Sequence, residues 1–262
     1  MIERQQIIEF CRITRRWMIY SILFFIPIFF AWFQENFSVF DLNKSIALHL
    51  LLGIGVLAWV LEIFLEDRIQ FKGSKLLLIL GLGVAFIFLI TTIFSIHPVI
   101  SLWGSYERLQ GLYNLLHYIG LTFLIIVTLK DKKSIHASIV ALLLGSGLAC
   151  IYGFLQLLKL DPLRWGEETD RIFSSFGQPN FFGHYISTLL PFTCYAIAYI
   201  AKRFYTRVAL FLLLTLQVIN IIFTYSRGAW LAIIGTVIIG VLWWLYIHGR
   251  KKLVIIISAV AV

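Results

Sequence analysis

The sequence predicts an all-α, polytopic membrane protein with eight membrane-spanning helices, the start of a ninth, and a cytoplasmic N-terminus. Three observations predict this fold class. Hydrophobic residues make up 60% of the 262 positions and charged residues only 13%, whereas soluble domains carry about 45–50% and about 25%. Apolar stretches of the length that crosses a bilayer recur along the chain. Basic residues concentrate on alternate sides of these stretches.

Each apolar stretch is a candidate spanning helix. Crossing the hydrocarbon core takes roughly 20 apolar residues, with a range of about 17–25. Eight stretches approach or meet this length: residues 17–33, 45–65, 76–94, 112–129, 136–158, 182–201, 208–224 and 229–247. A ninth begins at Leu253 and is still apolar at Val262. We therefore expect residues 1–262 to form a single transmembrane domain and to be the N-terminal fragment of a longer protein.

The distribution of basic residues predicts the orientation. One side of the alternating stretches, which includes the N-terminal segment, holds sixteen of the 22 Lys and Arg residues. The other side holds six: Lys44, Arg108, Lys159, Arg164, Arg171 and Arg227. Cytoplasmic loops carry the excess of positive charge, so the richer side is expected to face the cytoplasm. The net charge of +9 is thereby explained by topology, and we expect no nucleic-acid partner.

Residues 1–16 are polar and basic and precede the first apolar stretch without a small-residue cleavage site. We expect a retained first helix and not a removable signal peptide. The basic segment either lies as an interfacial helix on anionic lipid or anchors the chain beside the membrane. Glycines inside the stretches are expected to permit close helix packing: Gly53, Gly55, Gly81, Gly83, Gly145 and Gly147.

The external segments 95–111, 159–181 and 225–228 hold residues that topology does not require. The first contains Trp103, Tyr106, Glu107 and Arg108. Its aromatic rings either belong to the interfacial aromatic belt or offer a stacking face for a sugar. Glu107 and Arg108 either bind that sugar or pair with neighbouring charges.

The second external segment contains Arg171, Gln178 and Asn180 around a Gly-Gln-Pro turn, and His184 follows it. Asn180 either caps the helix that follows or contacts a substrate. His184 lies one turn into the membrane, where an imidazole is either a packed residue or a proton-transfer group.

The third segment contains Ser226 and Arg227. Only nineteen residues separate Arg207 from Arg227, and twenty-two separate Arg227 from Arg250. Arg227 is therefore expected near the hydrocarbon edge, where it either snorkels to the headgroups or faces the bundle interior and awaits an anion. Guanidinium binds phosphate bidentately and stays protonated, so it suits a lipid-linked phosphate. The sequence has no P-loop and no His pair at metal-ligand spacing, so we expect neither a metal nor a cofactor.

The motifs Arg171-Ile-Phe-x-x-Phe-Gly-Gln-Pro-Asn180-x-x-Gly183 and Thr224-x-Ser226-Arg227-Gly228-Ala-Trp230 resemble the bacterial O-antigen ligase and polymerase superfamily. The stretch Ser-Leu-Trp-Gly-Ser-Tyr-Glu-Arg-x-x-Gly at 101–111 is similar to a segment of many members. The resemblance spans about residues 75–245.

This resemblance implies a metal-independent GT-C-type glycosyltransferase of the bacterial cytoplasmic (inner) membrane. Such enzymes move a glycan from undecaprenyl pyrophosphate to a glycan, lipid or protein acceptor on the outer face. The resemblance implies that Arg171 and Arg227 hold the pyrophosphate. Members usually carry a later external loop with a histidine proposed as general base, and we expect that base beyond Val262. The alternative function is a transporter or flippase for a lipid-linked glycan or phosphorylated lipid.

Overall fold

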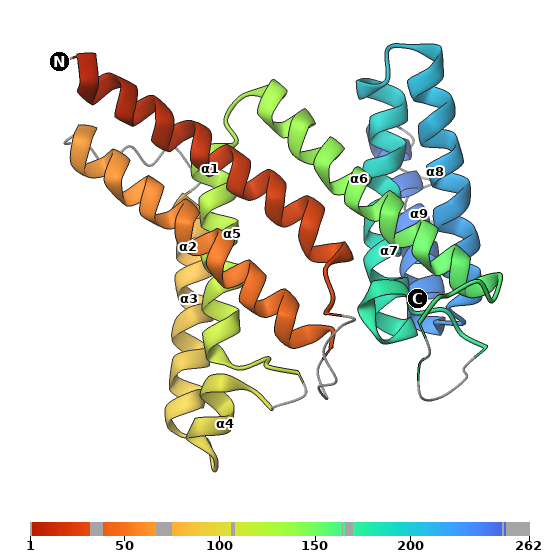
Figure 1. The fold of residues 1–262 in the computed structure, drawn as a ribbon, viewed down its shortest axis with the longest axis horizontal. Helices are drawn as coiled ribbons and strands as arrows, with labels where there is room; N and C mark the ends of the chain where they lie inside the picture. The colour runs from red at the N-terminus through yellow and green to blue at the C-terminus, as the bar shows by residue number, and fades with distance from the viewer. Residues whose placement is uncertain are drawn as a thin grey trace.

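The computed structural model describes residues 2–31, 39–66, 75–105, 108–163, 165, 170–247 and 249. These residues form helices joined by turns and contain no strand, which confirms the predicted all-α class (Figure 1). Each of the eight predicted stretches overlaps a helix, and the ninth, from Leu253, lies outside the described residues. The helices are α1 (Ile2–Ile28), α2 (Asp41–Glu66), α3 (Lys75–Ile93), α4 (Pro98–Trp103), α5 (Leu112–Thr128), α6 (Lys132–Leu157), η1 (Ser174–Phe176), α7 (Pro179–Tyr195), η2 (Ala196–Ile200), α8 (Phe204–Phe223) and α9 (Arg227–Ile247).

Five of these helices are long and apolar enough to cross a membrane, namely α2, α3, α6, α8 and α9. The apolar helix α5 is shorter, at 17 residues. The outward faces of these helices agree with contact with lipid, since Phe86 on α3 and Leu231 on α9 are 61% and 68% exposed. The prediction of a helical protein with membrane-spanning segments is confirmed at this level.

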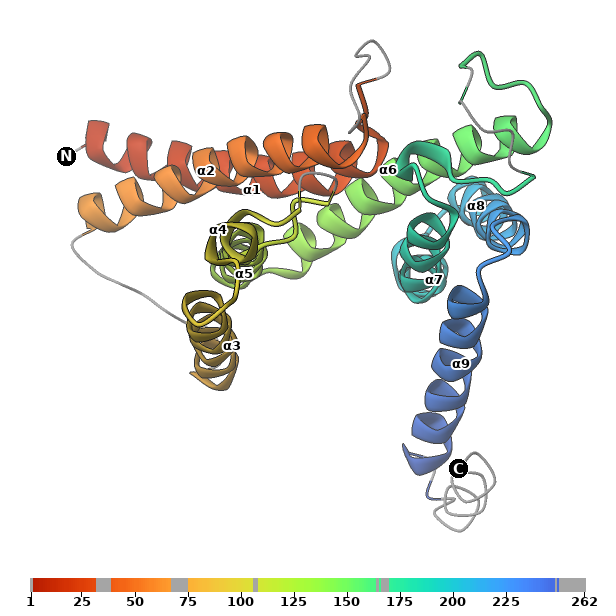
Figure 2. The ribbon, with the colours of Figure 1, turned by 90° about the horizontal axis from the view of Figure 1, so that it is seen from below.

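The helices gather around two hydrophobic cores. One joins α1, α2 and α5 through buried residues that include Ile19, Leu52 and Leu124. The other joins α6 to α9 around Phe182, with Cys150 and Ile221 against it. Helices α1 and α6 pack together and connect the two halves of the molecule (Figure 1). Figure 2 shows α9 extending away from the α1–α2 pair, and α9 packs on α7.

The predicted role of the glycines in close packing is confirmed at two positions. A Cβ atom at Gly145 would lie 2.5 Å from the carbonyl oxygen of Phe24, so only glycine lets α6 approach α1 this closely. A Cβ atom at Gly55 would lie 2.7 Å from Leu124. The prediction is wrong for Gly53 and Gly83, where a Cβ atom would meet nothing within 4 Å.

The basic N-terminal segment is part of α1 and continues without a break into the first apolar stretch. It packs along α2, where Arg12 Nε lies 2.8 Å from Glu62 Oε1. Arg12 also pairs with Glu66, and Arg15 pairs with Glu62. Glu62, which has no evident partner in the sequence, is thus an ion-pair partner for two arginines of another helix.

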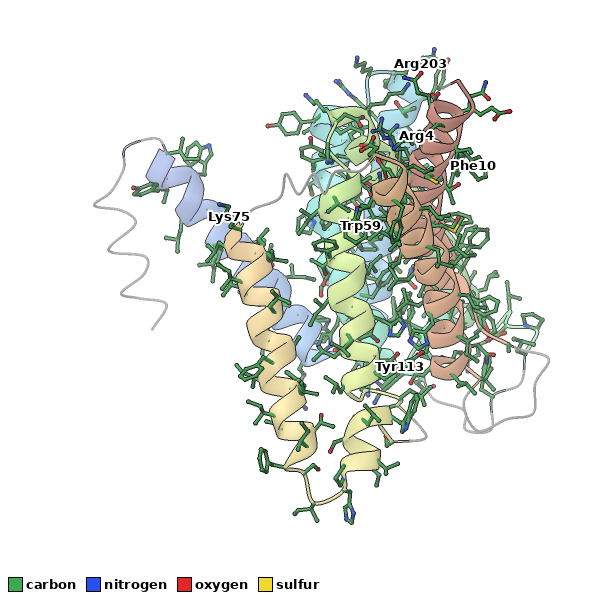
Figure 3. The ribbon with its side chains drawn as sticks, turned by 90° about the vertical axis from the view of Figure 1, so that its left-hand side faces the viewer. Arg4, Phe10, Trp59, Lys75, Tyr113 and Arg203 are labelled. Carbon is green, nitrogen blue, oxygen red and sulfur yellow. The ribbon has the colours of Figure 1, made fainter. Side chains whose placement is uncertain are left out.

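The ends of the helices fall at two opposite ends of the bundle. Figure 3 shows the labelled Arg4, Lys75 and Arg203 toward one end and Tyr113 toward the other. Within the α6–α8 core, Gln217 on α8 donates to Ser146 on α6 over 3.1 Å and accepts from Thr193 on α7 over 2.9 Å. All three side chains are buried, and such bonds between helices stabilise packing where lipid offers no hydrogen-bond partner.

Candidate functional site

The segment before α7 is fixed by bonds to the helices around it. Ile172 N donates to Phe223 O at the end of α8 over 3.3 Å. Gln156 on α6 accepts from two successive backbone amides, those of Phe173 and Ser174, at 3.2 and 2.7 Å. The segment is therefore held against α6 and α8 by its backbone.

The first half of the molecule also holds this segment. Ser175 Oγ donates to the Pro27 carbonyl over 2.5 Å, and Lys44 Nζ donates to the Ser175 carbonyl over 2.6 Å. The Lys44 ammonium lies 3.9 Å from the centroid of the Phe176 ring, a cation–π arrangement. Gly177 has φ of +69°, the left-handed conformation that glycine adopts without steric cost, and turns the chain into α7.

Arg171 ties the start of α7 to the end of α8. Its Nη2 donates to Asn180 Oδ1 over 2.9 Å, and its Nε donates to the Thr224 carbonyl over 2.9 Å. Gln178 is the N-cap of α7, with Pro179 as the first helical residue, so of the two alternatives for Asn180 the capping role is excluded. The Asn180 side chain instead holds the guanidinium.

The turn between α8 and α9 presents Arg227. Tyr225 has φ of +48°, and Ser226 is 1% exposed. The Ser226 hydroxyl accepts from Ala229 N over 3.4 Å, which is the bond of an N-cap residue to the third residue of a helix. Ser226 therefore fixes the start of α9. Arg227, the first residue of that helix, is exposed and makes no hydrogen bond or ion pair with any residue that the structure describes.

Two glycines bring α7 and α9 into close contact. A Cβ atom at Gly183 would lie 3.0 Å from Thr224 Oγ1 and 3.1 Å from the Cβ atoms of Ser226 and Ala229. A Cβ atom at Gly228 would lie 2.6 Å from His184 Nε2, so the His184 ring covers Gly228, next to Arg227.

The structure therefore gathers five of the predicted site residues, Arg171, Asn180, His184, Ser226 and Arg227, around the starts of α7 and α9. We call this group the α7–α9 site. Gln178 adjoins it as the N-cap of α7, half-buried. The first amides of a helix have no partner within the helix, and the helix dipole places positive potential there. Two guanidinium groups and two helix starts make this end of α7 and α9 a region that favours an anion.

The remaining predicted residues lie elsewhere. Tyr106 and Glu107 are outside the described residues. Trp103 and Arg108 are exposed and belong to α4 and the α4–α5 turn, which pack on α3 and α5 (Figure 1). Gly104, with φ of +88°, lies against the backbone of Gly111, and this contact closes the turn.

An aromatic cluster and a cavity adjoin that turn. The Trp103 ring lies 5.0 Å from Tyr113, which lies 4.9 Å from His49. His49 Nε2 and Asn114 Oδ1 are 2.5 Å apart, which gives His49 the partner that the sequence did not reveal. A cavity of about 240 Å³ between α3, α4 and α5 is lined by Phe88, Thr91, Thr92, Ser101, Gln110, Gly111 and Leu112. Hydroxyl and amide groups beside aromatic rings suit a sugar.

Three residues that support the α7–α9 site were not predicted as site residues from the sequence. Gln156 and Lys44 hold the segment before α7, and Asp161 accepts from Gln156 Nε2, Tyr152 Oη and Trp165 Nε1 at 2.9–3.1 Å. Gln156 could have been identified from the sequence, because it is a polar residue in a long apolar stretch and such a residue needs a hydrogen-bond partner in the membrane.

Comparison of the chain with protein-family models, with curated proteins and with solved structures found no significant match. The resemblance in the sequence motifs and the geometry of the α7–α9 site together provide the basis for the function proposed below.

Proposed function

We propose that this chain is the membrane domain of a glycosyltransferase that moves a glycan from an undecaprenyl-pyrophosphate carrier to an acceptor at the outer face of the bacterial cytoplasmic membrane. It acts as an O-antigen ligase or a polysaccharide polymerase. The observation that carries the proposal is the meeting of Arg171, Asn180 and Arg227 at the starts of α7 and α9, because these residues come from two separate motifs.

Glycan transfer from a pyrophosphate carrier needs positive charge beside the leaving group, which arginine side chains can supply. In transfer, an acceptor oxygen forms a bond to the anomeric carbon, the bond from that carbon to pyrophosphate breaks, and the acceptor proton passes to a base. Negative charge grows on the departing pyrophosphate, and fixed cations stabilise it. Arg171, held by Asn180 and the Thr224 carbonyl, is pre-oriented, and exposed Arg227 supplies the second guanidinium.

The proposal includes the topology. All eight helices that overlap the predicted stretches cross the membrane, and the N-terminus is cytoplasmic. Arg4, Lys75 and Arg203 lie toward one end of the bundle (Figure 3), as expected if positively charged segments remain in the cytoplasm. The α7–α9 site then lies at the outer face, within reach of a lipid-linked pyrophosphate. His184, whose ring covers Gly228 next to Arg227, contacts the donor.

The test is glycan transfer by the full-length protein in membranes that contain a lipid-linked donor. Arg171→Ala and Arg227→Ala are expected to reduce the transfer rate about 100-fold or more, the loss typical of removing one group that stabilises a transition-state charge. Lys159→Ala is the matched control, because Lys159 is an exposed cation on the same predicted side but outside the site. Equal rates in all three variants would contradict the proposal.

The alternative transporter is tested in the same membranes. A transporter moves the labelled lipid-linked glycan across the bilayer without forming a new glycosidic bond. Movement of intact donor at a rate that exceeds transfer, with the same dependence on Arg171 and Arg227, would favour the transporter over the glycosyltransferase.

A further inference from the structure

A second concentration of charge lies between α1, α2 and α5, away from the α7–α9 site. It surrounds a cavity of about 230 Å³ lined by Arg12, Arg15, Arg16, Trp59, Glu62, Ile63, Glu66, Val127, Thr128 and Lys130. We call it the α1–α2–α5 cavity. Figure 3 shows Trp59 on the same side of Tyr113 as Arg4 and Arg203, so the cavity belongs to the half of the bundle with the basic end.

The lining carries excess positive charge. Four basic side chains face two carboxylates, a net excess of two positive charges. Glu62 and Glu66 are engaged by Arg12 and Arg15. Arg16 lies 3.5 Å from Asp131, a contact between side chains that are both about half exposed. Such an exposed pair contributes little, so Arg16 and Lys130 are able to bind an incoming anion.

Three buried polar atoms of the lining lack a hydrogen-bond partner in the described part of the chain: Arg15 Nε, Thr128 Oγ1 and Glu62 Oε2, of which Glu62 Oε2 still forms an ion pair with Arg15. Arg15 is 5% exposed and Thr128 is 6% exposed. Arg15 Nε and Thr128 Oγ1 make no hydrogen bond with any other residue of the described part of the chain. Buried donors and hydroxyls are nearly always hydrogen-bonded in native proteins, because an unmade bond costs free energy. The side chains of Arg15 and Thr128 line the same cavity, so both atoms are candidates for hydrogen bonds to the acceptor oxygens of one guest.

The size and the apolar wall of the cavity define that guest further. Its volume is below the roughly 300–1,000 Å³ of pockets for drug-sized ligands, which fits a phosphate with part of a headgroup. Trp59, Ile63 and Val127 form the apolar wall. Phe64, on the same turn of α2 as Ile63, is 75% exposed and provides a surface for acyl chains. Basic groups at the surface of a membrane attract anionic lipids, and arginine binds their phosphate bidentately.

We propose that the α1–α2–α5 cavity binds the phosphate of an anionic glycerophospholipid in the leaflet at the basic end of the bundle. Arg15 Nε and Thr128 Oγ1 bond the phosphate oxygens, while Arg16 and Lys130 balance the charge. This site is separate from the α7–α9 site and does not depend on the proposed glycan transfer. Because the lipid joins α1, α2 and α5, it stabilises the first half of the molecule.

The experiment measures the thermal unfolding midpoint of the purified chain in neutral detergent micelles, with phosphatidylglycerol, phosphatidylcholine or inorganic phosphate added at equal phosphate concentration. Phosphatidylglycerol is expected to raise the midpoint, and the other two are expected to leave it nearly unchanged. Inorganic phosphate that reproduces the whole shift would overturn the lipid assignment, and so would phosphatidylcholine.

Two variants locate the effect. The double variant Arg16→Gln/Lys130→Gln is expected to lose at least half of the shift. The control Lys132→Gln/Lys133→Gln removes the same charge from neighbouring exposed positions that do not line the cavity, and it is expected to keep the full shift. Equal losses in the two double variants would overturn the proposal, because they would indicate general attraction of charge.

Thr128→Val distinguishes binding from a defect in folding. Valine has nearly the shape of threonine and removes an unpartnered hydroxyl, so the variant is expected to be as stable as the parent chain without lipid. Its shift with phosphatidylglycerol is expected to fall by half or more. A Thr128→Val chain that responds to phosphatidylglycerol as strongly as the parent chain would overturn the proposed contact.

Discussion

The Nη2 atom of Arg171 donates a hydrogen bond to Asn180 Oδ1 over 2.9 Å, and the two residues belong to the loop before α7 and to the first turn of α7. The same guanidinium donates to the Thr224 carbonyl at the end of α8. One side chain therefore connects the first turn of α7 with the α8–α9 turn that presents Arg227. In the proposed function, this bond orients a cation toward the pyrophosphate before the donor arrives.

Asn180 variants test this orientation. Asn180→Ala is expected to lower kcat/KM for glycan transfer about tenfold, because a hydrogen bond to a charged group is worth roughly 1.5–3 kcal/mol. Asn180→Asp is expected to lower it about 100-fold, since its carboxylate pairs with Arg171 and repels the pyrophosphate. Thr188→Ala, also on α7 but bonded only within its own helix, is the control. Activity of Asn180→Asp near that of the control would contradict the orientation.

The close contact between α7 and α9 predicts that adding a single methyl group at Gly183 destabilises the protein. Gly183→Ala places a Cβ atom 3.0–3.1 Å from Thr224, Ser226 and Ala229, so α9 must shift. We expect a loss of about 1–3 kcal/mol in the free energy of unfolding, measured by titration with SDS in mixed micelles. Gly235→Ala, on α9 where a Cβ atom meets nothing within 4 Å, is expected to be neutral or slightly stabilising. A Gly183→Ala chain as stable as Gly235→Ala would show that the two helices are not packed this closely.

The ion pairs between α1 and α2 predict that removing the charge of Glu62 lowers the free energy of unfolding strongly. Arg15 and Glu62 have side chains only 7% and 10% exposed. Glu62→Gln leaves the buried Arg15 charge without its counter-charge and is expected to cost about 3–5 kcal/mol of stability in the same titration. The double variant Arg15→Met/Glu62→Met is expected to recover most of this loss. A double variant less stable than Glu62→Gln alone would contradict burial of the pair.

The start of α6 predicts a dependence on acid. Asp131 is the N-cap of α6, and its carboxylate accepts from Ser134 N and Ser134 Oγ at 2.8 and 2.9 Å. These bonds to the backbone and the hydroxyl of Ser134 hold the pKa of Asp131 below its usual value. A lowered pKa in the folded state means that the contribution is present above the unfolded-state pKa of about 3.9 and is lost as the pH falls through the folded-state value.

Unfolding midpoints of the parent chain and of Asp131→Asn, measured from pH 6 down to pH 3, test this contribution. Asparagine is also a good N-cap, so the difference between the two midpoints is expected to shrink as the pH falls from about 3.9 toward the lowered folded-state pKa of Asp131. The parent chain is expected to gain stability relative to Asp131→Asn as the pH rises through the same range. A difference between the two midpoints that stays constant from pH 6 to pH 3 would contradict a stabilising role of the ionised Asp131 carboxylate.

The positions of the long helices along the chain were predicted from the sequence, because a helix that can cross a membrane needs a long stretch of apolar residues. Helices overlap all eight predicted stretches. The sequence did not predict that residues 2–16 are part of α1. Their basic side chains pack by pairing with acidic residues of α2, and the sequence alone does not show which helices are neighbours. It also missed α4, because six residues beside Pro98 leave no helical periodicity to recognise.

The candidate site was predicted in its residue types but not in its geometry. Arg171, Asn180 and Arg227 were singled out, and the structure joins the motifs that contain them. The sequence placed Trp103 and Arg108 in the same functional group, whereas they lie with α4 and α5. Pairing across helices, such as Lys44 with Ser175 or His49 with Asn114, depends on helix rotation, which the apolar pattern does not determine when helices are apolar on all faces.

The central claim is that Arg171 and Arg227 bind a pyrophosphate together, and binding of the carrier lipid tests it most directly. Dissociation constants of undecaprenyl pyrophosphate and undecaprenyl monophosphate are measured for the parent chain, Arg227→Ala and the Lys159→Ala control. The parent chain and the control are expected to bind the pyrophosphate at least tenfold more tightly than the monophosphate. This ratio corresponds to about 1.4 kcal/mol or more, the free energy expected for one additional charge-assisted contact. Arg227→Ala is expected to bind the two lipids equally. An Arg227→Ala chain that keeps the full preference would contradict the account.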